Sequence, residues 1–292
     1  MVRLELSTEL GYEVLDDRCD FIFNIHAAHM PRQMVVHESL TLSQNLPTDF
    51  YTDPATQNRF LRVRAANGPF TLNYSAVLDI AHFEAGPQAL TEFTPHALPG
   101  DVLPYLSPSR YCQSDRLMTF AAEEFGQLPM GYGRAQAICT WVQQHVSFQS
   151  NTTNSNTSAL DTLVERVGVC RDFAHLMIAL CRAVNLPARM ASGMDFGADP
   201  ALGPPDFHAY VEVYLADGDT GRWYMFDPSG TAVPMGFVRF CTGRDAADVA
   251  FATIFGRVNS MQPVITIQAV PNGQGQMVVP EYVPYALSTD GP

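Results

Sequence analysis

Short runs in which apolar and polar residues alternate fill the first part of the chain. Apolar residues at every second position are typical of a strand with one buried face. Such runs cover residues 33–42, 59–63 and 70–80, and turn residues such as those at 67–69 separate them. The pattern predicts an N-terminal domain, residues 1–105, built as a β-sandwich.

The period of the pattern changes after a proline-rich stretch at residues 98–109, where we expect the linker between two domains. Apolar residues then recur three and four positions apart, which is the spacing of one helix face. Two amphipathic helices are predicted in this way. One contains Ile138 and Val142, and the other begins after Ser158 and stops at Gly168.

A third helix, residues 170–185, is apolar on nearly every face, so we expect it to be buried all round as the central helix of its domain. Its ends agree with this, because Asp172 stands in the first turn and Asn185 can take a left-handed cap. Residues 110–292 are therefore predicted to form a second domain of the α+β class. Its strands are expected at residues 188–194, 208–215, 222–227, 264–270 and 277–283.

The charge balance argues against a nucleic-acid partner, since 17 basic residues stand against 30 acidic ones and the net charge is −13. All of the basic residues are Arg. No apolar run approaches the roughly 18 residues of a membrane span. The six cysteines include no Cys-x-x-Cys pair, and the chain start does not look like a secretion signal. We therefore expect a cytoplasmic protein with no membrane partner.

Cys170 is expected to be the first residue of the buried helix, directly after Gly168 and Val169. At a helix N-terminus the backbone N–H groups are unpaired and the helix dipole is positive, which favours a thiolate. The other five cysteines are interpreted as buried apolar thiols, which is a common role of free Cys. Cys170 is therefore the candidate nucleophile.

A hairpin supplies the candidate base. Apolar and polar residues alternate over residues 208–215, as in a strand with one buried face. A four-residue loop, 216–219, would place His208 directly opposite Asp227, near enough for the carboxylate to hold an imidazole N–H. A one-residue change in this loop would break the register, and the alternative is a structural His and a turn Asp before Pro228.

Together these residues describe an activated nucleophile. Cys170 attacks, His208 accepts and later donates the proton, and Asp227 orients His208. The Cys170 N–H is a natural oxyanion donor. Such a set catalyses acyl transfer from an amide through a thioester.

Five short motifs surround these residues: Thr157-Ser-Ala-Leu-Asp-Thr-Leu, Gly168-Val-Cys-Arg-Asp-Phe-Ala-His175, Leu186-Pro-Ala-Arg189, His208-Ala-Tyr-Val-Glu212 and Phe226-Asp-Pro-Ser229. In this order they resemble the motifs of bacterial transglutaminase-like proteins, which are often described as cysteine proteases. The resemblance implies a papain-like core, with a central helix packed on an antiparallel sheet, in which Cys170, His208 and Asp227 form the triad. Tyr210 stands where the family usually has Trp, which keeps an aromatic wall.

Other candidates are weaker. His26, His29 and His37 lie in a β region without Cys partners, so we expect no metal and no cofactor. Trp141 could overhang the reacting thiol, but its place on an apolar helical stripe favours core packing. Residues 195–206, rich in Gly and Pro, are either a lid over the thiol or a surface loop.

Three functions compete. Water would resolve the thioester in a peptidase or amidase, and a substrate amine would resolve it in a transglutaminase. We favour the hydrolase, acting on a protein or peptide amide, because no sequence feature identifies an amine pocket. A noncatalytic binding module would not need all three of Cys170, His208 and Asp227. The oligomeric state is left open.

Overall fold

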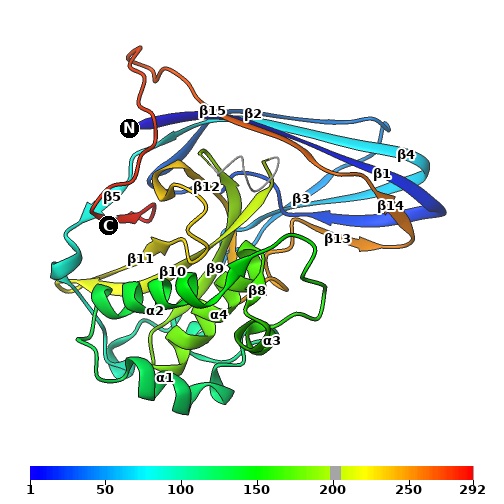
Figure 1. The fold of residues 1–292 in the computed structure, drawn as a ribbon. Coiled ribbons are helices and arrows are strands. Elements are labelled where there is room, and N and C mark those ends of the chain that lie inside the picture. The colour runs from blue at the N-terminus through cyan, green and yellow to red at the C-terminus, as the bar shows by residue number, and fades with distance from the viewer. Residues whose placement is uncertain (198–204, 292) are drawn as a thin grey trace.

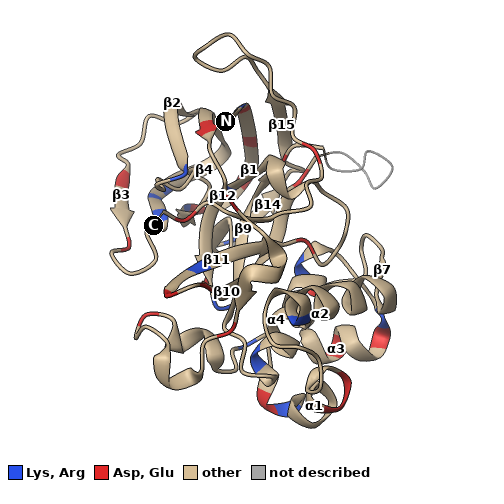
Figure 2. Ribbon diagram, turned by 90° about the vertical axis from the view of Figure 1, so that its left-hand side faces the viewer, with Lys and Arg blue, Asp and Glu red and all other residues tan. Residues whose placement is uncertain are grey.

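The computed structural model of the chain describes residues 1–197 and 205–291. It has two parts, an antiparallel sheet of long strands and an α+β core in which helices pack on a second sheet (Figure 1). None of the helices in the described part of the chain is both long and apolar enough to cross a membrane. Figure 2 shows basic and acidic residues scattered over both parts.

Two strands of 22 residues, β1 (Val2–Phe23) and β4 (Arg59–Ile80), organise the first sheet. They pair with each other along most of their length, and the register shifts between Val14 and Arg18. Gly68, opposite Val14, adopts a φ of +103°, which glycine allows at low cost. The two strands therefore turn a corner together and fold back over themselves, as Figure 1 shows at the far end of β1 and β4.

The folded sheet encloses an aromatic core. The ring of Tyr12 lies 5.0 Å from that of Phe21, although nine positions of one strand separate the two residues. Phe70 of β4 lies 5.2 Å from Phe21. The expected sandwich is thus made from one bent sheet, and the turn residues at 67–69 mark a corner within β4. The other strands of this sheet are β2 (Gln33–Leu42), β3 (Asp49–Thr52), β13 (Ala252–Phe255), β14 (Val258–Ser260) and β15 (Val264–Ala269).

The chain returns to the first sheet near its C-terminus. Strands β13, β14 and β15 all pair with β1. Residues 252–269 were expected in the second domain, 110–292, and lie in the first sheet instead, while the division near residues 105–110 stays a prediction. The strand expected at 277–283 is wrong, because Pro280 cannot donate to a ladder and the segment runs without strand structure. A short pair joins β5 (Phe83–Ala85) and β16 (Ala286–Ser288).

The second part has the predicted α+β architecture. Its sheet has the order β11-β10-β9-β12, with β6 beside β10, and α4 packs on β9 and β10. The strands are β6 (Leu90–Thr91), β9 (Ala188–Asp195), β10 (Phe207–Asp217), β11 (Thr220–Phe226) and β12 (Phe237–Gly243). The helices are α1 (Met118–Phe125), α2 (Tyr132–His145), α3 (Ala159–Glu165) and α4 (Cys170–Ala183). A parallel pair, β7 (Ser147–Phe148) and β8 (Val167–Gly168), leads into α4.

The central helix α4 agrees with its prediction. It is buried along nearly its whole length, and Asn185 takes the left-handed conformation with a φ of +65°. Helix α3 ends earlier than expected, since Arg166 adopts a φ of +59° and the chain then enters β8 before Gly168. Helix α1 has no counterpart in the sequence analysis.

A buried charge cluster joins three strands of the second sheet. Glu212 of β10 is 1% exposed and accepts hydrogen bonds from Arg189 of β9 at 2.6 Å and Arg239 of β12 at 2.9 Å. Burial opposes the charge of Glu212, but the two guanidinium groups outweigh burial and lower the pKa of this carboxyl. Glu212 is thus the nearer counter-ion of both cations, and Asp290 adds longer ion pairs to Arg189 at 3.8 Å and to Arg239 at 3.6 Å.

We expect Glu212→Gln to lower the free energy of unfolding by about 3 to 5 kcal/mol, because it removes the nearer counter-ion of two buried guanidinium groups and leaves them only the more distant, partly exposed Asp290. Urea unfolding at neutral pH measures the loss. Asp20→Asn is the matched control, since Asp20 pairs with Arg64 at 48% and 60% exposure and its loss should barely move the midpoint. Equal midpoints for the two variants would contradict the assigned role of Glu212.

Candidate active site

Cys170 is the first residue of α4 and lines a cavity at the start of that helix. The carboxylate of Asp172 fixes this end of the helix by accepting a hydrogen bond from the Val169 N–H at 2.9 Å. The Cys170 N–H stands at the first helical position, where no acceptor exists within the helix. Cys170 is partly exposed, whereas the other five cysteines are buried. The structure thus places one accessible thiol at the head of the central helix.

His208 lies on β10 and lines the same cavity. The hairpin that follows differs from the prediction, since Asp217 pairs with Thr220 and the loop holds two residues instead of four. Gly218 adopts a φ of +60° in this tight turn. The pairing is shifted by two residues, so the expected register, with His208 directly opposite Asp227, is wrong.

Asp227 nevertheless reaches His208, because the chain curls around the carboxylate after β11. Its Oδ1 lies 3.4 Å from Nε2 of His208. The N–H and O–H of Ser229 donate to Oδ1 at 3.0 and 2.6 Å, and the N–H groups of Thr231 and Ala232 donate to Oδ2 at 2.9 and 3.0 Å. Four donors from the loop therefore hold the carboxylate in place.

The electrostatics favour a charged pair. Burial opposes the charge of Asp227, but hydrogen bonds from His208 and Ser229 outweigh burial and hold the pKa of this carboxyl below its usual range. Burial also opposes the charge of His208, but Asp195, Cys170 and Asp227 outweigh it and raise the pKa of the imidazole well above its ordinary value. The site accordingly stabilises the imidazolium form of His208 next to an ionised Asp227.

Asp195 is the residue of this site that the sequence analysis missed. It ends β9, is buried, and places its Oδ2 3.3 Å from Nδ1 of His208. In the sequence it follows the predicted strand 188–194 directly. No sequence spacing identifies it, because its contact with His208 depends on the antiparallel pairing of β9 with β10, which sets Met194 opposite Phe207.

The cavity around Cys170 and His208 has a volume of about 720 Å³. One wall is aromatic, because the rings of Phe207 and Phe251 stack with their centroids 4.5 Å apart. Phe251 directly precedes β13, which pairs with β1, so the first sheet helps to place this wall. Of the segment considered as a lid, residues 198–204 lie outside the described residues.

Comparison with known proteins places this geometry in a family. The Transglutaminase-like superfamily matches residues 119–228, and the family "Bacterial transglutaminase, N-terminal domain" matches residues 2–94. A crystal structure of a candidate cysteine protease from Cytophaga hutchinsonii is 36% identical, with a TM-score of 0.89 over 98% of this chain and 97% of that chain. The chain belongs to the transglutaminase-like superfamily.

Mycobacterial proteins are also similar to this transglutaminase-like chain. ML0607 of Mycobacterium leprae is 25% identical over 195 residues, which are 64% of this chain and 68% of that protein. Rv2569c of Mycobacterium tuberculosis is 34% identical over 111 residues, which are 35% of each chain. The N-terminal match, residues 2–94, lies within the β domain predicted at residues 1–105. The superfamily match contains Cys170, His208 and Asp227.

The weaker candidates lie elsewhere in the transglutaminase-like fold. Trp141 stacks on His145 with centroids 3.9 Å apart and packs against Phe120, so it is a packing residue. His26 is buried against the ring of Tyr74, and burial lowers the pKa of this imidazole to about 4. Within residues 1–197 and 205–291, no three side chains of His, Cys, Asp or Glu gather as a metal-binding group.

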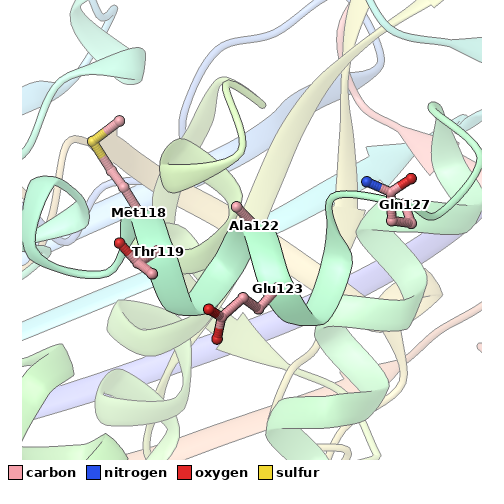
Figure 3. A pocket seen from close by; sticks show the side chains of 5 residues that line it. All are labelled: Met118, Thr119, Ala122, Glu123 and Gln127. Atoms are coloured by element: carbon pink, nitrogen blue, oxygen red, sulfur yellow. The ribbon is translucent and has the colours of Figure 1, made fainter.

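A second hollow lies on the outer face of α1 (Figure 3). Its polar groups are the hydroxyl of Thr119, the carboxylate of Glu123 and the amide of Gln127, and no His or Cys lines it. The cavity at the N-terminus of α4, which Cys170 and His208 line, is therefore the candidate active site. The residues that line the second hollow are Met118, Thr119, Ala122, Glu123 and Gln127.

We expect Cys170 to be the fastest cysteine to react with iodoacetamide, because it is partly exposed and the others are buried. Burial also raises the pKa of Cys112 and of Cys241 to about 12, which leaves little thiolate at neutral pH. Peptide mapping after a brief reaction of the native protein identifies the modified thiol.

The fast reaction should disappear in Cys170→Ala and persist in Cys241→Ala. If iodoacetamide modifies Cys112 or Cys241 of the native protein before it modifies Cys170, Cys170 is not the nucleophile.

Proposed function

We propose that this transglutaminase-like chain is a cysteine-dependent enzyme that acts on a peptide amide through a thioester on Cys170. One observation carries the proposal. An accessible thiol at a helix N-terminus shares a cavity with His208, whose Nε2 lies 3.4 Å from the carboxylate of Asp227. Nucleophile, base and orienting group are the three parts of a thiol triad.

The first half of the reaction forms the acyl-enzyme. Nε2 of His208 is engaged by Asp227, so Nδ1 is the nitrogen that takes the thiol proton. The thiolate of Cys170 attacks the carbonyl carbon, and the Cys170 N–H donates to the oxygen that becomes negative. The imidazolium then gives its proton to the leaving nitrogen as the C–N bond breaks. An amine leaves and a thioester remains.

The second half releases the acyl group. His208 takes a proton from the incoming nucleophile, which attacks the thioester carbon. The C–S bond then breaks, and the thiol of Cys170 is restored when it regains a proton. Water yields a carboxylic acid, and a primary amine yields a new amide.

Hydrolysis of a protein or peptide is the favoured outcome, because the relative from Cytophaga hutchinsonii, 36% identical over nearly the whole chain, is described as a cysteine protease candidate. Transfer to an amine is the second candidate, since residues 2–94 match the N-terminal domain of bacterial transglutaminases. The chain has no Lys, so as a transglutaminase it could not crosslink itself through its own side chains.

Mass spectrometry separates these outcomes. Peptide libraries that include Gln donors are incubated with the protein, with and without an added primary amine. We expect cleaved or deamidated products from the wild type and none from Cys170→Ala, whose melting temperature should stay within a few degrees of the wild type. Amine adducts would establish the transferase, and full activity of Cys170→Ala would refute the thiol mechanism.

Asp227→Asn tests the orienting group. We expect kcat to fall by about 10 to 10³ fold, less than the roughly 10⁴ fold of the analogous change in a serine triad, because a thiol depends less on its base. The measurement is kcat against pH on a substrate from the library. Asp161→Asn is the control, since Asp161 caps α3 outside the site and its loss should spare kcat. An unchanged profile in Asp227→Asn would exclude Asp227 from the triad.

A further inference from the structure

Two carboxyl groups flank the imidazole of His208. Oδ1 of Asp227 lies 3.4 Å from Nε2, and Oδ2 of Asp195 lies 3.3 Å from Nδ1. A triad accounts for only one of them, because one carboxylate suffices to orient the base. The second carboxyl group, that of Asp195, lies beside Nδ1, the nitrogen to which the mechanism assigns the thiol proton of Cys170.

The surroundings of the two carboxyl groups differ. Asp227 receives four hydrogen bonds from the loop that follows β11. Within the described residues, Asp195 accepts no hydrogen bond from the backbone, although both of its carboxyl oxygens are buried, and the polar groups that face it are the Tyr210 hydroxyl and Nδ1 of His208. Asp227 is thus held by its own loop, whereas the cation nearest to Asp195 is His208 itself.

The Nδ1 proton therefore has two candidate acceptors. It moves between Cys170 and the leaving nitrogen during the reaction. An ionised carboxylate at 3.3 Å attracts the same N–H and stabilises the imidazolium, which makes it a poorer acid toward the substrate. A neutral carboxyl exerts no such pull.

We propose that Asp195 is a positioning residue that decides which group holds the Nδ1 proton of His208. When Asp195 is protonated, Nδ1 serves Cys170 and the leaving nitrogen. When Asp195 is ionised, it accepts the N–H and withdraws His208 from the thiol. This inference rests on the proposed function, since it assigns control over the same triad.

The other groups around Asp195 do not supply a competing cation. His208 and Tyr210 face it from β10, Asp227 from the loop after β11, and Tyr282 from the C-terminal segment. On β12 its partner is Phe237. Apart from His208 these neighbours are neutral or negative, so the charge of Asp195 acts mainly on His208.

The expected pH dependence follows from this environment. Burial raises the pKa of Asp195 to about 7, with His208 as the main opposing influence. The carboxyl is thus neutral below about pH 7 and ionised above it. Because the ionised form competes for the Nδ1 proton, activity should fall as the pH rises through about 7.

The direct test is NMR of the full-length chain labelled with ¹⁵N-histidine. We expect the Nδ1 resonance of His208, identified by its loss in His208→Gln, to show a titration step near pH 7 in the wild type. The step should be absent in Asp195→Asn and in Asp195→Ser, two variants that lack the carboxylate, so that one unfolded variant does not remove the test. Asp161→Asn is the control and should keep the step, because Asp161 caps α3 outside the site.

Activity supplies the second readout. On a library substrate, wild-type kcat/KM should fall about 30 fold from pH 6 to pH 8.5, as the protonated fraction of Asp195 drops to about 3%. In Asp195→Asn the fall should be less than about threefold. A purely structural role would instead lower activity equally at all pH values, and that result would overturn the inference.

The two proposals fail separately. Persistence of the His208 step in both Asp195 variants overturns the inference whatever the activity, because the NMR test needs no substrate. Loss of the step together with full activity of Cys170→Ala upholds the pairing of Asp195 with His208 and refutes the thiol mechanism.

Discussion

The geometry of the site depends on the buried carboxylate of Glu212. It binds Arg189 and Arg239 and thereby fixes β9, β10 and β12 relative to one another. Asp195 stands at the end of β9, and His208 lies four residues before Glu212 on β10. A slip of either strand would leave charges buried without partners, which is far costlier than a lost surface ion pair. The same charges that stabilise the sheet thus determine the distance between two ionisable groups of the site.

This cluster also meets the first sheet. The backbone N–H of Arg239 donates to Oε1 of Gln33 at 2.8 Å, and its carbonyl accepts from Nε2 of Gln33 at 2.8 Å and from the Ala28 N–H at 2.9 Å. The side chain of Gln33 is fully buried, so these bonds form away from water. The first sheet is therefore attached to β12, an edge strand of the second sheet, and its strand β13 directly follows Phe251 in the cavity wall.

The sequence predicts those features that are local. Helix α4 could be predicted because its residues are apolar on nearly every face and Asn185 and Pro187 mark its end. The register of paired strands could not be predicted, because Asp217 and Gly218 indicate a turn but do not determine how many residues form it. Asp227 contacts His208 although the predicted hairpin register is wrong, because hydrogen-bond donors in the loop after β11 orient the carboxylate toward the imidazole ring.

Asp195 could not be identified from sequence spacing, because its role depends on the alignment of β9 with β10. The bend within one sheet could not be predicted for a related reason. Asn67, Gly68 and Pro69 look like the end of a strand, yet β4 continues through them because β1 bends at the same place. In both cases the deciding contact joins residues distant in the chain, which local patterns do not encode.

The return of the C-terminal strands to β1 has a consequence for biosynthesis. Leu4 pairs with Leu78 on one side and with Ala269 on the other, so the second neighbour of the first strand is made only after the whole core. During translation that side of β1 presents unpaired backbone groups, the kind of edge that recruits strands from other chains. This edge of β1 can be covered only after residues 264–269 have been synthesised, so completing the sheet requires pairing between strands that lie far apart in the chain.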